Sequence, residues 1–163
     1  EKLDSNLRRG PFRQFLCISI ENFMLAIQID QIREVIEAYE VTPVFKVPEL
    51  LRGLINLRGN VIACIDISRE IGLDLRPLNL KTKFIIIGYG DSSIALCADA
   101  VHGMKNLCLQ EIQKADSVLN ERQQVFVEGI YEEVNSTLLL LSIPEIFNSE
   151  HLTEFTDMGN NTQ

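Results

Sequence analysis

Apolar residues in this chain come mostly in runs of five to eight, which are rich in Ile and Val and often alternate with polar residues. A period of two is typical of β-strands, because successive side chains of a strand point to opposite faces of the sheet. Runs such as residues 85–87 and 138–141 fall far short of the roughly 20 apolar residues that a membrane-spanning helix needs. The pattern therefore predicts ten or so short strands in a globular domain.

Several of these runs are separated by short polar breaks, which predicts β-hairpins. Glu21-Asn22, Arg58-Gly59-Asn60, Gly90-Asp91-Ser92 and Asn135-Ser136 supply turn-forming residues at the four breaks. The predicted strand pairs are 12–20 with 23–29, 54–57 with 61–67, 83–89 with 93–100, and 124–132 with 137–143.

The connections between these hairpins predict single helical turns. Ile29, Ile32 and Ile36 have helical spacing with Asp30 as a possible cap, yet residues 33–41 fit a strand equally well, and both interpretations stay open. Residues 48–53 begin with Pro and end with Gly, as a helical turn does. We expect further turns after Ser68, ending at Gly72, and at residues 144–147, which begin a short C-terminal helix.

Strands joined in this way predict an all-β fold, and two small barrels are the favoured form. One set of hairpins lies on each side of the polar link 75–82. The ends of the chain are polar, so we expect a flexible tail at 1–11, a folded domain at 12–150 and a second tail at 151–163. A chain of 163 residues, of which 46% are hydrophobic, has enough apolar content for one such domain.

Charge argues against several classes of partner. The net charge is −8, and no run of Lys or Arg offers the basic stripe that binds nucleic acid or an anionic membrane. Arg8 and Arg9 are not followed by the apolar segment of a secretory signal. We expect a soluble cytoplasmic protein that neither binds nucleic acid nor inserts into a membrane.

Residues that support catalysis or metal binding are sparse. The four cysteines form no C-x-x-C pair, which predicts reduced thiols in the core and no metal site. His102 and His151 are the only histidines, one at a predicted strand end and one in the predicted tail, which is a poor basis for a catalytic triad. Gly88-Tyr89-Gly90 lacks the third glycine of a dinucleotide fingerprint. We therefore expect no enzymatic activity and no cofactor.

A polar cluster, residues 56–60, interrupts the apolar sequence from Gly53 onward. Arg58 within it has two interpretations. It is a solvated turn residue, the favoured one since exposed ion pairs contribute little to stability. Alternatively, a carboxylate fixes it as part of a recognition surface.

The stretch from Gly53 to Ile67, with the sequence GLINLRGNVIACIDI, resembles the central signature of the CheW family of bacterial chemotaxis coupling proteins. Further resemblance covers residues 14–16, 25–27, 32–35, 99–101, 129–130, 138–143 and 145–147. It implies two five-stranded β-barrels packed over a shared apolar seam. It also implies a non-catalytic adaptor that links methyl-accepting chemoreceptors to the regulatory domain of the histidine kinase CheA.

The resemblance also implies a set of receptor-binding residues. Glu34 and Arg58 match the family's acidic and arginine positions, and we expect them to pair across neighbouring strands. Ile32, two residues before Glu34, should share its strand face and contact the receptor. Asn56 and Leu57, next to Arg58, complete the predicted receptor site.

Val41, Gly53 and Val61, at or near the edge of the first barrel, match positions associated with kinase contact, although ordinary strand packing would explain them too. Ala63-Cys64 stands where the family often has a proline, which should restore a backbone donor to that strand. Two alternatives remain within the same resemblance: a CheW-like domain of a larger CheA- or CheV-type protein, and an adaptor of a pilus-motility pathway. A ligand-binding or hydrolytic barrel has no site residues to support it.

Overall fold

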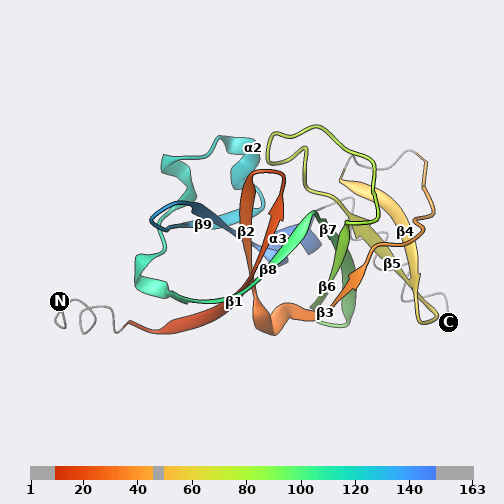
Figure 1. Ribbon diagram of the computed structural model, residues 1–163, viewed down its shortest axis with the longest axis horizontal. Helices are drawn as coiled ribbons and strands as arrows, with labels where there is room; N and C mark the ends of the chain where they lie inside the picture. Colours follow the sequence, from red (N-terminus) through yellow and green to blue (C-terminus); the bar gives the residue numbers. More distant parts are fainter. Residues whose placement is uncertain (1–9, 46–49, 150–163) are drawn as a thin grey trace.

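The computed structural model describes residues 10–45 and 50–149, and its strands form two five-stranded sheets (Figure 1). The first sheet, called barrel A here, contains β1 (Phe12–Ile20), β2 (Phe23–Gln28), β8 (Ala100–Cys108), β9 (Val127–Glu132) and β10 (Thr137–Leu141) in the order β8-β1-β2-β10-β9. The second, barrel B, contains β3 (Ile32–Glu37), β4 (Leu51–Leu57), β5 (Asn60–Ile65), β6 (Lys83–Tyr89) and β7 (Ser92–Ala98) in the order β3-β6-β7-β5-β4. The all-β prediction is confirmed.

The division between the two barrels differs from the one predicted at residues 75–82. Barrel A combines strands from both ends of the chain, whereas barrel B is continuous from β3 to β7. Two parallel pairings, β2 with β10 and β5 with β7, join strands that are distant in sequence. Local sequence patterns predict hairpins and not such pairings, which is why the expected boundary was wrong.

Each sheet is nearly closed into a barrel by one isolated bridge. In barrel B the chain beyond β3 crosses to the opposite edge, where Thr42 pairs with Leu54 of β4. In barrel A the chain beyond β8 does the same, and Gln113 pairs with Ile130 of β9. The word barrel therefore describes partly open sheets, each with one backbone bridge across its opening.

Alternation along the strands separates three apolar clusters. Phe15 and Cys17 of β1 belong to the interior of barrel A, while Leu16 and Ile18 of the same strand belong to a cluster that both barrels share. Barrel B contributes residues such as Ile85 of β6 to this shared cluster. The largest apolar core thus lies at the seam between the barrels, as the resemblance implied.

Short helices connect or cover the strands. They are η1 (Ile29–Gln31), η2 (Leu109–Glu111), η3 (Ala115–Ser117), α2 (Glu121–Gln124) and α3 (Ile143–Phe147). α3 confirms the predicted C-terminal helix, and Figure 1 places it between the sheets. Among the described residues, no helix is both long enough and apolar enough to cross a lipid bilayer.

Three local predictions need correction. The turn at η1 follows Gln28, so Asp30 lies within it and does not cap it. Residues 51–53 belong to β4 and not to a helical turn, because Leu51 pairs with Ile65 of β5; residues 48–49 lie outside the described part. His102 lies inside β8 and not at a strand end. Of the predicted tails, only Gly10 and Pro11 are described, and His151 is not.

Candidate functional site

The turn between β4 and β5 places Arg58 at the surface. Arg58 has φ 52° and Gly59 has φ 88°, so two consecutive residues adopt left-handed backbone. A two-residue turn with this backbone matches the right-handed twist of the two strands that it joins. Glycine adopts a left-handed backbone without strain, whereas a residue with a side chain is strained there. The sequence predicted a hairpin turn at residues 58–60. Within this segment Asn60 begins β5, and Arg58 takes a positive φ that strains a residue with a side chain.

The Arg58 guanidinium binds both oxygens of the Glu34 carboxylate. Nη1 and Nη2 of Arg58 donate to Oε2 and Oε1 of Glu34, each at 2.6 Å. The side chains are 67% and 30% exposed, respectively. Hydrogen bonding by Arg58 lowers the pKa of Glu34, and the same contact raises the pKa of Arg58. The predicted pair is confirmed: Arg58 is a solvated turn residue, as one interpretation had it, and a carboxylate fixes it, as the other had it.

This pair does not join neighbouring strands of the sheet, contrary to expectation. β3 and β4 are the two outer strands of barrel B, so the pair spans the barrel's open side. Further along the same gap, the Tyr39 hydroxyl donates to the Asn56 carbonyl at 2.6 Å. Thr42 and Leu54 then exchange two backbone hydrogen bonds of 2.8 Å. Arg58 therefore belongs to a row of contacts that closes barrel B.

Ile32 does not share a strand face with Glu34. Ile32 pairs with Ile87 and Glu34 with Ile86, which leaves Arg33 as an extra residue in a β-bulge. Ile32 is half-buried and packs against the cluster shared by the two barrels. The bulge interrupts the alternation on which the prediction depended, because it adds one residue between the two side chains.

Asn56 and Leu57 have structural contacts next to Arg58. Asn56 Oδ1 accepts a hydrogen bond from the Gly59 N–H at 2.9 Å, which ties the turn to the strand before it. Leu57 is half-buried and packs against the interior cluster of barrel B. The polar turn is thus held by a hydrogen bond within the hairpin and by apolar packing in the interior of barrel B.

The three residues predicted to contact a kinase all lie on barrel B. Val41 and Val61 are half-buried. Gly53 is buried with φ 150°, and a Cβ built there would lie 2.1 Å from the Thr42 carbonyl oxygen and 2.9 Å from Val41 Cγ1. Val61 pairs with Asn56 across the hairpin. Gly53 therefore permits the close approach of the closing segment to β4.

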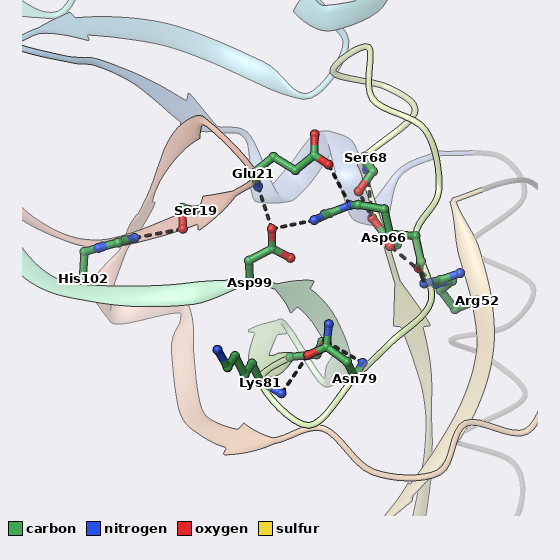
Figure 2. A network of polar contacts seen from close by, with 11 residues as sticks. Ser19, Glu21, Arg52, Asp66, Ser68, Asn79, Lys81, Asp99 and His102 are labelled. Carbon is green, nitrogen blue, oxygen red and sulfur yellow. Dashed lines mark hydrogen bonds and ion pairs between the residues drawn. The ribbon is translucent and has the colours of Figure 1, made fainter.

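A second polar network, which the sequence did not predict, joins the barrels. Arg76, in the link before β6, donates to Asp99 Oδ2 at 2.7 Å and lies 3.5 Å from Glu21 Oε1. Figure 2 shows the Asp99 carboxylate pointing toward the backbone nitrogen of Glu21, whose N–H donates to the same Oδ2 at 2.6 Å. Arg52 of β4 donates to the Arg76 carbonyl and pairs with Asp66. The resemblance singled out the position of Asp99, but nothing in the sequence linked it to Arg76.

The contact of Ser19 with His102 in Figure 2 fixes β8 against β1. His102 Nε2 and Ser19 Oγ are 2.8 Å apart. The carboxylate of Asp99 nearby is engaged by Arg76 and the Glu21 N–H instead. In the described part of the chain, no three His, Cys, Asp or Glu side chains are grouped so as to hold a metal ion.

Two packed barrels with a fixed, exposed arginine–carboxylate pair define a class of all-β protein that presents a rigid surface. A family model described as the CheW-like domain matches residues 14–151. The chain belongs to the CheW family of chemotaxis adaptor proteins.

Relatives and a solved structure agree with this membership. The chain is 20% identical over 149 residues to the chemotaxis protein CheW of Treponema pallidum, which covers 89% of this chain and 88% of the relative. It is 22% identical over 138 residues to CheW of Rhizobium meliloti, covering 85% and 89%. A crystal structure of a CheW scaffolding protein from Thermoanaerobacter tengcongensis has a TM-score of 0.74 at 23% identity, over 85% of this chain and 94% of that one. The last comparison shows the fold alone.

Proposed function

We propose that this protein is a cytoplasmic, non-catalytic coupling protein that holds methyl-accepting chemoreceptors and the regulatory domain of the kinase CheA together. The observation that carries the proposal is the Arg58–Glu34 pair, which is bidentate yet largely exposed. A bidentate arginine on a closed barrel edge presents donors in a fixed direction. Family membership supplies the process in which such a surface acts.

The receptor would dock along the surface that includes Ile32, Glu34, Asn56, Leu57 and Arg58. Ile32 and Leu57 are half-buried, so part of each side chain remains available to an apolar side chain of a receptor helix. Glu34 and Arg58 would lie at the polar rim of that contact. In this arrangement the pair orients the partner more than it stabilises the fold.

The kinase would contact barrel B near Val41 and Val61. Val41 lines a surface hollow of about 170 Å³ together with Pro43, Arg52 and Leu78, so its side chain is accessible to a partner. Gly53 is buried and would act on kinase binding indirectly, by setting the path of the backbone beside Val41.

Titration calorimetry with a receptor tip fragment, and separately with a CheA regulatory domain, tests the proposal. We expect binding to both. Arg58→Ala should weaken at least one of the two by roughly tenfold. The melting temperature should stay nearly unchanged, because the Arg58 side chain is 67% exposed and an ion pair in contact with solvent contributes little to stability.

Arg13→Ala is the matched control, because Arg13 is also an exposed arginine but lies on β1 of barrel A and contacts the uncharged Gln28. It should bind as the unaltered protein does. Binding to neither fragment would contradict the proposed function. A large loss of stability in Arg58→Ala with binding preserved would instead show that the pair is structural.

A further inference from the structure

Two cysteine thiols touch inside barrel B. Sγ of Cys64 on β5 and Sγ of Cys97 on β7 are 3.5 Å apart. The residues are 0% and 4% exposed and belong to the same interior cluster. Neither side chain belongs to the proposed receptor or kinase surface, and packing alone does not require two thiols in contact.

We propose that Cys64 and Cys97 form a redox modification site, at which a small peroxide converts the two thiols into a disulfide between β5 and β7. The inference concerns the interior of barrel B and does not depend on the proposed partners. The bond would tie the β4–β5 hairpin, which carries Arg58, to the middle strand of its sheet.

The geometry brings the sulfurs within reach of a bond. A disulfide has an S–S length of about 2.05 Å, so the two atoms must approach by about 1.5 Å. Cys64 pairs with Ala95, which places Cys97 two residues further along β7. β5 ends at Ile65 and β7 at Ala98, so the adjustment falls near the ends of both strands.

A small oxidant has a path to Cys97. This residue lines a cavity of about 260 Å³ whose walls include Asp66 and Arg76 and the exposed residues Pro77 and Asn79. A water molecule occupies about 30 Å³ in the liquid, and hydrogen peroxide is only slightly larger. Cys64 does not line this cavity, so Cys97 should react first.

The reaction balances with hydrogen peroxide as the oxidant. The Cys97 sulfur attacks one peroxide oxygen, which gives a sulfenic acid and one water. The Cys64 sulfur then attacks the sulfenic sulfur; the S–S bond forms, and hydroxide leaves and takes up the thiol proton as a second water. The hydrogen bond with Cys64, together with burial, raises the pKa of Cys97. Few thiolates are present at neutral pH, so the reaction should be slow there and faster at higher pH.

The chain contains its own control. Cys17 and Cys108 are also buried and free, but both lie in barrel A. In the β1–β8 ladder Cys17 pairs with Gly103, whereas Cys108 pairs with Phe12. Five residues of strand separate them, roughly 17 Å at 3.4 Å per residue, so they cannot form a disulfide in the fold.

Peptide mapping tests the proposal. The folded protein is exposed to hydrogen peroxide, then unfolded in acid, alkylated and digested with trypsin. The four cysteines fall into four different tryptic peptides, namely 14–33, 59–69, 84–105 and 106–114. We expect 59–69 joined to 84–105 with the loss of two hydrogens, the other two cysteines alkylated, and full release by a thiol reductant. Four alkylated cysteines, or a mixture of pairings, would overturn the proposal.

Two alanine variants sharpen the result. Cys97→Ala should leave Cys64 alkylated after peroxide, while Cys108→Ala should form the 64–97 link as the unaltered chain does. A disulfide that involves Cys64 in Cys97→Ala, or the loss of the 64–97 link in Cys108→Ala, would also overturn the assignment. The mapping of the unaltered chain decides the matter even where Cys97→Ala does not fold.

Discussion

The Arg58 guanidinium is fixed on Glu34 while its own backbone adopts a φ of 52°. Asn56 secures the turn through the Gly59 N–H, and the Tyr39 hydroxyl secures the Asn56 carbonyl. Hydrogen bonds on both sides hold a strained residue in place, and such strain is concentrated at functional sites of proteins. The orientation of the Arg58 side chain therefore depends on its contact with Glu34 and on the contacts that Asn56 and Tyr39 make around the turn.

Gly53 and Gly59 give a matched comparison at this scale, because both have positive φ but only Gly53 is crowded. A Cβ at Gly53 would meet the Thr42 carbonyl, whereas nothing lies within 4 Å of a Cβ at Gly59. We expect Gly53→Ala to lower the free energy of unfolding by about 3 kcal/mol, through strain and overpacking. Gly59→Ala should cost about 1 kcal/mol, through strain alone. Urea unfolding measures both free energies. Equal losses in the two variants would show that a Cβ at Gly53 is not crowded by the Thr42 carbonyl.

At the scale of elements, α3 covers the seam although it has only five residues. Ser142 Oγ caps it by accepting from the Glu145 N–H at 3.4 Å, and Pro144 occupies its first turn. Ile143, Ile146 and Phe147 are buried in the shared cluster. So short a helix is not stable alone, and its stability must come from this packing.

Ile146→Ala should therefore destabilise the whole fold by about 3 kcal/mol, since it leaves a cavity in the largest core. Glu145→Ala, one position earlier on the exposed side of the same helix, should change stability by less than about 0.5 kcal/mol. Denaturant unfolding followed by circular dichroism compares the two. Similar values would show that α3 does not pack in the seam.

Elements differ in how far the sequence predicted them. β1, β2 and α3 were predicted almost to the residue because alternation, a polar break and a proline mark them locally. β8 was missed beyond residue 100: it is an outer strand, and His102, Gly103, Met104 and Asn106 are exposed, so its apolar pattern is weak. The helical turn predicted from Pro48 to Gly53 gave way to strand pairing of Leu51 with Ile65, a tertiary contact that outweighs local preference.

At the scale of the molecule, the polar network around Arg76 holds the barrels in one arrangement. It connects the link before β6 to the β1–β2 turn through Glu21 and to the β7–β8 junction through Asp99. The sequence around Arg76 could not predict its ion pairs, because its partners Glu21 and Asp99 lie 55 and 23 residues away. The candidate site was predictable only as far as its residues matched a known motif.

Low pH should weaken this network. Burial alone would raise the pKa of Asp99, but the hydrogen bonds from Arg76 and the Glu21 N–H outweigh it, and the pKa lies below its usual value. A carboxyl with a lowered folded pKa stabilises the fold above its unfolded pKa of about 3.9, and this contribution is lost as pH falls through the folded pKa. We expect Arg76→Ala to lose about 1 kcal/mol at pH 7, the magnitude of a partly exposed pair.

The same variant should show a smaller fall in stability below about pH 4 than the unaltered protein. Urea unfolding at a series of pH values measures this difference. Arg33→Ala should keep the full pH dependence, because its partners, the Ser93 hydroxyl and the Gly90 carbonyl, do not titrate. An unchanged pH dependence in Arg76→Ala would show that Asp99 owes its low pKa to another group.

The pairing of β2 with β10 has a consequence for how the protein is made. A ribosome releases the β1–β2 hairpin first, yet three of the five strands of its sheet are still to be translated. Barrel B, whose strands are consecutive, can assemble while those strands are synthesised. The β1–β2 hairpin must therefore wait for the missing strands of its own sheet until β10 has been translated.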